Sequence, residues 1–212
     1  MPNAESERPR GIRNEPLSVL LRGLTKGPPG PIRIRDMIDY FGHRAFGAVL
    51  FVFAVPNLLP LPPGSSTVLG LPLVVVAPQL ALGVGRLWVP RALAERTVQR
   101  EALARGFDRL LPALERIERL LAPRLKFMFG PVGDRIIGLI CFLLSLVLIL
   151  PIPLGNMLPA AAVSALALAI TQRDGAMALV GYLLTAASVA VLALSAGAVL
   201  AVAGRLLSIL PL

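Results

Sequence analysis

Long apolar segments alternate with short charged segments along this chain. Residues 45–85, 136–172 and 175–204 contain no Asp, Glu, Lys, Arg or His. Uncharged apolar runs of about 18 residues or more are typical of membrane-embedded segments. The pattern therefore predicts an all-α, polytopic integral membrane protein. Because the first 13 residues are polar, we expect no cleavable signal peptide.

The charges are mostly basic, and they cluster in the N-terminal region and between the first two apolar blocks. Only 16% of the 212 residues are charged, and the formal net charge is +9. A soluble domain carries about 25% charged residues. The positive-inside rule places the basic N-terminal region, residues 1–32, and the central linker, residues 86–123, in the cytoplasm. We expect a bilayer containing anionic phospholipids as the partner of these charges, and no nucleic acid.

The central linker carries an apolar stripe with helical spacing. Its apolar residues recur every three or four positions, at Leu103, Phe107, Leu110, Leu114, Ile117 and Leu121. The arginines lie largely off this stripe, so the segment predicts an amphipathic helix, bent at Pro112. Such a helix lies either on an anionic leaflet or against the protein itself or a partner.

An internal repeat relates the first two apolar blocks. A shift of 91 positions aligns residues 33–64 with residues 124–155 without gaps, with 10 identities over 32 positions. The shared pattern is Gly-x-Arg-x-x-Gly, then 12 mostly apolar residues, then Pro-x-Pro-x-Gly. Five of the identities are Gly or Pro, which chance matching of apolar sequence does not favour. We expect membrane repeats at residues 33–85 and 124–173, each a broken-helix hairpin.

The lengths of these segments leave two topologies open. The first arms, residues 45–59 and 136–150, would each measure about 22 Å as helix, whereas a bilayer core is about 30 Å thick. The hairpins therefore either span a thinned bilayer or are re-entrant. The C-terminal region, residues 174–212, forms either one tilted transmembrane helix or two helices broken near Gly197. Small residues in this last block favour close helix packing, including a homodimer.

The tips of the two hairpins combine proline, glycine and small polar residues. They contain Pro60, Pro62, Gly64, Ser65, Ser66, Pro151, Pro153, Gly155 and Asn156. Proline makes the backbone non-helical, and Ser, Thr or Asn can cap the helix that follows. The tips are either turns at the membrane surface or loops that meet near the midplane, with helix N-termini directed at an anion.

Two arginines and one acidic residue are the candidate site residues outside the tips. Arg44 and Arg135 occupy equivalent positions in the two repeats. Each either anchors its helix among lipid headgroups or binds a phosphate, whose oxygens match the guanidinium fork. No carboxylate lies within an apolar block, which argues against ion coupling, and Asp134 is the nearest candidate for that role.

Enzymatic chemistry is not indicated. The sequence lacks a Ser/His/Asp set, a carboxylate pair at catalytic spacing and a Gly-rich phosphate loop. The only histidine, His43, has no partners at metal-site spacing. We therefore expect no enzyme activity, no metal and no cofactor.

Several segments resemble the ExoD family of bacterial exopolysaccharide synthesis proteins. They are residues 42–47, residues 56–67, residues 151–156 and the turn at residues 172–175. The resemblance runs from about residue 17 to residue 204. It implies a small bacterial inner-membrane protein that is needed for exopolysaccharide production, and it carries over no catalytic residues.

Two functions are compatible with this resemblance. In the first, the protein transports or flips an anionic or lipid-linked precursor, with Arg44 and Arg135 on the phosphate and the tips as a gate. In the second, it is a non-transporting accessory subunit whose basic linker binds other polysaccharide synthesis proteins.

Overall fold

The computed structural model describes residues 16–26, 30–59, 64–119, 121, 124–150 and 155–209. The helices are α1 (Leu17–Thr25), α2 (Ile34–Phe41), α3 (Ala45–Ala54), α4 (Ser65–Ala81), α5 (Arg91–Ala94), α6 (Arg100–Glu118), α7 (Pro131–Ile149), α8 (Met157–Gln172) and α9 (Gly175–Ile209). Short 3₁₀ turns are η2 (Gly42–Arg44), η3 (Val55–Leu58) and η4 (Lys126–Met128). In these ranges the only strands are β1 (Pro31–Arg33) and β2 (Thr97–Gln99), which pair antiparallel. The predicted helical class is confirmed.

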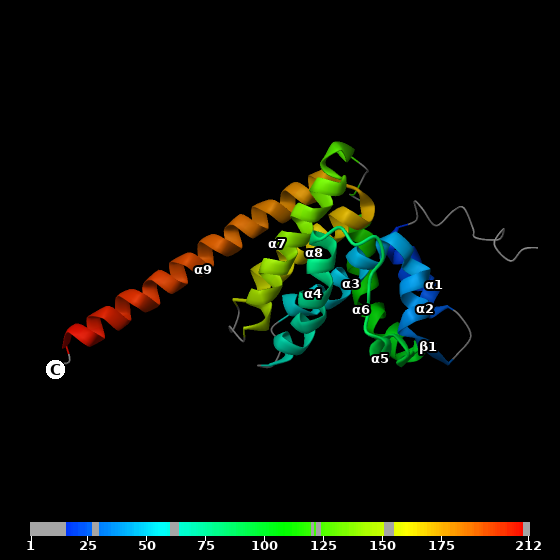
Figure 1. The fold of residues 1–212 in the computed structure, drawn as a ribbon, viewed down its shortest axis with the longest axis horizontal. Helices are drawn as coiled ribbons and strands as arrows, with labels where there is room; N and C mark the ends of the chain where they lie inside the picture. Colours follow the sequence, from blue (N-terminus) through cyan, green and yellow to red (C-terminus); the bar gives the residue numbers. More distant parts are fainter. Residues whose placement is uncertain are drawn as a thin grey trace, which may run out of the picture.

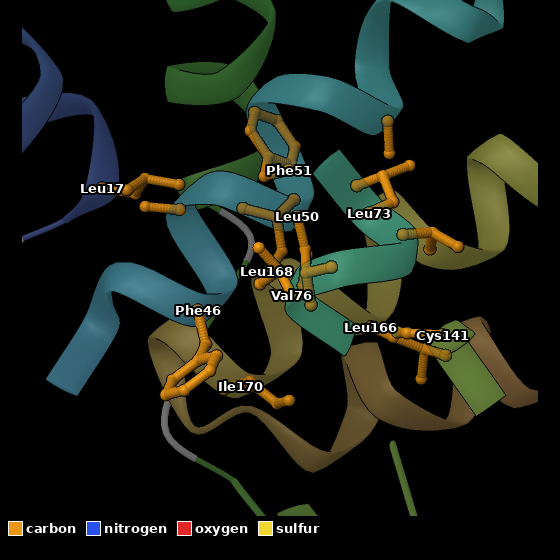
Figure 2. Close-up of a cluster of buried hydrophobic side chains, with 14 of the residues drawn as sticks. Leu17, Phe46, Leu50, Phe51, Leu73, Val76, Cys141, Leu166, Leu168 and Ile170 are labelled. Carbon is orange, nitrogen blue, oxygen red and sulfur yellow. The ribbon is translucent and has the colours of Figure 1, made fainter. Parts of the chain in front are cut away.

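Four apolar helices form the centre of the molecule. α3 contacts α4, and α7 contacts α8, the helix pairs predicted to be the arms of the two hairpins. Each arm also packs against the other hairpin, α3 against α8 and α4 against α7. Leu50, Val76 and Leu168 meet between α3, α4 and α8 (Figure 2). Their burial supplies the non-directional attraction that holds the four helices together.

Two glycines let helices of different hairpins approach closely. A Cβ atom on Gly47 of α3 would lie 2.8 Å from the carbonyl oxygen of Ala167 in α8. A Cβ atom on Gly138 of α7 would lie 2.8 Å from the Cα of Ala81 in α4. Gly47 and Gly138 are equivalent positions in the sequence repeat. The repeated glycine therefore lies where each first arm crosses the second arm of the other hairpin.

The amphipathic linker helix packs against the protein itself. Phe107, Leu111 and Leu114 of α6 are buried, and α6 packs along α1. The helix continues through Pro112. At its end, the Glu118 carboxylate accepts hydrogen bonds from Ser18 of α1 and, at 2.8 Å, from Nε2 of Gln172 in α8. Part of the predicted stripe therefore packs on its own chain, whereas Ile117 is 37% exposed.

The C-terminal block is one continuous helix. α9 runs from Gly175 to Ile209 through Gly197, so the alternative of a break near Gly197 is wrong. Its first part packs against α8, and its remainder extends away from the other helices (Figure 1). At 35 residues the helix measures about 52 Å.

Two described helices are long and apolar enough to cross a membrane. They are α7 and residues Gly175–Ser195 of α9. A third span results if Ile34–Phe41 and Ala45–Leu58 form one segment. The two helices are bent by 119° relative to each other. α4 and α8 are apolar but shorter. These helices are consistent with a membrane protein.

We predict that Gly138→Ala destabilises the four-helix centre. The added Cβ would collide with the backbone of α4, and overpacking of this kind costs about 1–3 kcal/mol. The midpoint of thermal unfolding in detergent should fall. The matched control is Gly106→Ala in α6, where a Cβ meets nothing within 4 Å and alanine favours helix. Equal midpoints for wild type and Gly138→Ala would show that α4 and α7 do not need this close approach.

Candidate anion-binding site

Three arginines converge on one cavity at the end of the bundle where α3 and α7 begin. Arg44, Arg135 and Arg173 line this cavity, which has a volume of about 760 Å³. Its walls also include Leu80 and Gly83 from the end of α4 and Thr171 from the end of α8. We call this cavity the arginine pocket. The structure thus brings Arg44 and Arg135 together, and it adds Arg173, which the sequence analysis did not single out.

The position of Arg135 depends on Gly83. A Cβ on Gly83 would lie 2.7 Å from Nε of Arg135 and 3.0 Å from one of its terminal nitrogens. Gly83 also has a φ of 73°, a conformation that favours glycine. Within the described residues, Arg135 forms no ion pair and no hydrogen bond. Its exposed guanidinium is therefore available for a ligand that enters the pocket.

Arg173 and Asp134 also line the pocket and form an ion pair with each other. One terminal nitrogen of Arg173 lies 3.3 Å from Oδ2 of Asp134, and the guanidinium lies 5.7 Å from the ring centre of Phe129. The second carboxylate oxygen of Asp134 is buried and has no hydrogen-bond partner among the described residues. These contacts hold the Arg173 side chain at the edge of the pocket.

The arginine pocket carries excess positive charge. Three arginines and one aspartate among its described lining residues give a formal charge of +2. The Asp134 carboxylate offsets one of these charges, and a basic cavity of this kind is a candidate site for an anion. Guanidinium groups from different segments match several oxygens of one phosphate better than a single ammonium does.

The tip residues lie at the other end of the bundle. Gly64, Ser65 and Ser66 precede or begin α4, and Gly155 and Asn156 precede α8. From Arg135 to the end of α7 the chain rises about 21 Å. The described tip residues therefore do not share a cavity with the arginines. The candidates Pro60, Pro62, Pro151 and Pro153 lie outside the described residues.

The polar side chains at the tips bind the end of α7. Asn156 does not cap α8 with its side chain. Its Nδ2 instead donates to the carbonyls of Leu150 at 3.1 Å and Leu148 at 3.4 Å. The Thr67 hydroxyl donates to the carbonyl of Ile149 at 2.9 Å. The prediction that these side chains cap the following helix is therefore wrong. They donate to carbonyls at the end of α7 instead, because carbonyls at a helix C-terminus have no intrahelical donor.

A buried asparagine that the sequence analysis missed lies at the same end. Asn57 in η3 is 2% exposed, and its Nδ2 donates to the carbonyl of Phe53 at 2.9 Å. The buried amide oxygens of Asn57 and Asn156 have no hydrogen-bond partner within the described residues. An asparagine inside an uncharged apolar block was the signal that could have identified it.

Comparison with known proteins identifies the family. The family described as "Exopolysaccharide synthesis, ExoD" matches residues 17–194. The chain belongs to the ExoD family. It is 31% identical to Protein ExoD of Rhizobium meliloti (strain 1021) over 179 residues, which cover 81% of this chain and 74% of that protein. It is also 29% identical to an uncharacterized protein of Synechocystis over 153 residues, 71% of each chain. No solved structure matches it.

This family is linked to exopolysaccharide synthesis, and its match covers both ends of the bundle. Residues 17–194 contain all three arginines of the pocket and the side chains that bind the end of α7. The resemblance seen in the sequence is therefore confirmed as family membership.

For this ExoD-family protein we predict that Asn156→Ala loosens the tip end. The substitution removes two hydrogen bonds to α7 and leaves its carbonyls unpaired, at a cost of about 1–3 kcal/mol. Thermal unfolding in detergent should shift to lower temperature. Ser65→Ala is the matched control, since Ser65 occupies the equivalent repeat position. A larger loss for Ser65→Ala than for Asn156→Ala would contradict this reading of the tip.

Proposed function

We propose that this ExoD-family protein binds an anionic, lipid-linked precursor of exopolysaccharide synthesis and moves it across the bacterial inner membrane. The phosphate lies in the arginine pocket, held by Arg44, Arg135 and Arg173. The observation that carries the proposal is the convergence of these arginines from three separate parts of the chain on one cavity. No covalent chemistry is required for such a role.

The arrangement of charges supports binding more than simple anchoring. An anchoring arginine places its charge among headgroups around the helix and needs no defined neighbour. Here the Arg135 guanidinium lies against Gly83, a residue whose Cβ would displace it. Arg173 is held by Asp134 and Phe129. A group that is held in place, as Arg173 is, loses less conformational entropy when it binds a ligand.

The outer surface of α7 supports a membrane-spanning arrangement. Its exposed apolar residues follow one helical stripe, at Val132, Ile136, Leu139, Leu143, Leu146 and Leu150. This stripe covers about 27 Å along the helix axis, close to the thickness of the hydrocarbon core, about 30 Å. We therefore propose that the hairpins span the membrane, with the arginine pocket at the cytoplasmic surface and the tips at the opposite one.

We predict that the Arg44→Gln/Arg135→Gln double variant loses lipid movement. Purified protein in liposomes should move a fluorescent polyprenyl phosphate between leaflets, and the double variant should lower the rate at least about ten-fold, because two charge-assisted contacts are lost. The readout is quenching of the outer-leaflet label by an impermeant reductant.

The control for this experiment is Arg116→Gln in α6, an exposed arginine outside the pocket. It removes one positive charge outside the pocket and should leave the rate unchanged. Unaltered movement in the double variant would exclude the arginine pocket as the binding site. Copurification with a polysaccharide synthase without lipid movement by wild type would instead support an accessory role.

Cysteine labelling tests the proposed topology. In a Cys141→Ala background, Ser65→Cys at the tip end should react with an impermeant maleimide in intact spheroplasts. Gly85→Cys, which is exposed at the pocket end, should react only after permeabilisation. Protection of both positions in intact spheroplasts would instead indicate re-entrant hairpins that enter from the cytoplasm.

A further inference from the structure

A second cavity adjoins the arginine pocket. It has a volume of about 580 Å³, within the range of pockets that enclose small ligands. Its lining residues are apolar, and they come from α1, α2, α3, α4, α6, β2 and the loop after α4. Phe41, at the end of α2, lines both cavities. We call the second cavity the apolar groove.

The apolar groove runs along the helices rather than across them. On α3 it is lined from Ala45 to Phe53, and on α4 from Val68 to Val76. Each of these stretches rises about 12 Å. Ala45 directly follows Arg44 of the arginine pocket, whereas Val68 lies near the tip end. The groove therefore extends from the arginine pocket toward the tips, parallel to the proposed membrane normal.

The loop after α4 forms part of the groove wall and is fixed there. The side-chain oxygen of Gln79 accepts a hydrogen bond from the backbone nitrogen of Trp88 at 2.8 Å. The side-chain nitrogen of Gln79 donates to the carbonyl of Trp88 at 3.0 Å. Trp88 lines the groove, while the residue as a whole is 62% exposed. A tryptophan at such an edge suits a boundary between apolar and polar surroundings.

We propose that the apolar groove binds the hydrocarbon chain of a single-chain lipid phosphate whose phosphate lies in the arginine pocket. This inference rests on the proposed function and specifies the class of its ligand. Charge and apolarity are adjacent but separate, as they are in an amphiphile with one anionic end. The shared wall at Phe41 places the chain next to the phosphate. One groove beside one basic pocket accommodates one chain, which favours a prenyl phosphate over a diacyl phospholipid.

The sole tryptophan makes this proposal directly testable, because it lines the groove. The protein is placed in phosphatidylcholine nanodiscs and titrated with farnesyl phosphate, farnesol, phosphatidic acid or inorganic phosphate. Farnesyl phosphate should shift Trp88 emission to the blue with saturation. We expect its Kd to be about ten-fold lower than that of farnesol, since only it can also contact arginine. Inorganic phosphate should leave the emission unchanged.

Two variants test the binding of the hydrocarbon chain and the binding of the phosphate separately. Leu71→Asn places an amide in the groove and should weaken farnesyl phosphate about ten-fold. Its matched control is Leu143→Asn on α7, since both leucines are 53% exposed and only Leu71 lines the groove. Arg135→Gln should weaken farnesyl phosphate and leave the affinity for farnesol unchanged.

The outcomes distinguish this inference from the proposed function. The groove is excluded as the lipid site if Trp88 shows no saturable response to farnesyl phosphate. It is also excluded if Leu71→Asn and Leu143→Asn have equal effects. In both cases the double arginine variant still tests the arginine pocket. Phosphatidic acid competing as well as farnesyl phosphate overturns the single-chain assignment. An Arg135→Gln variant with unchanged farnesyl phosphate affinity separates the groove from the pocket and also overturns the inference.

Discussion

The close approach of helix backbones at two equivalent glycines organises this protein. Gly47 and Gly138 lie three residues after Arg44 and Arg135, one turn along α3 and α7. Each glycine packs against the end of a second arm from the other hairpin. The arginine one turn earlier is therefore placed at the junction of the two hairpins. The repeated Gly-x-Arg-x-x-Gly motif thus has a physical reason, because its last glycine fixes where its arginine lies.

The local sequence pattern predicted the positions of the helices well. It did not predict the contacts between segments that are distant in the sequence. The apolar blocks located the helices α3, α4, α7 and α8, since helix formation depends on the local sequence pattern. The apolar stripe of the linker predicted α6. It did not predict the surface against which α6 packs, because any apolar surface can bury such a stripe. A glycine within an apolar run allows a break but does not require one, so Gly197 could not decide the course of α9.

The candidate site was predictable only where the repeat carried it. Arg44 and Arg135 stood out as equivalent positions, and they do line one cavity. Arg173 and Gly83 have no counterpart in the repeat, and they reach the pocket only through packing of α4 and α8. The tips and the arginines looked like parts of one site because both were repeated. The length of α7 places them at opposite ends, a separation that the predicted length of the first arms, about 22 Å, already implied.

The two repeats differ where they enter the bundle, and this difference creates a single groove. In the second repeat α7 is helical from Pro131 onward, so Val132 points outward and is 69% exposed. In the first repeat Gly42 has a φ of 54°, the chain turns sharply, and the equivalent residue, Phe41, is buried. This turn bends α2 away from the axis of α3 by 119°, and Phe41 lines both the basic cavity and the apolar one. A strictly symmetric pair of hairpins would not produce that shared wall.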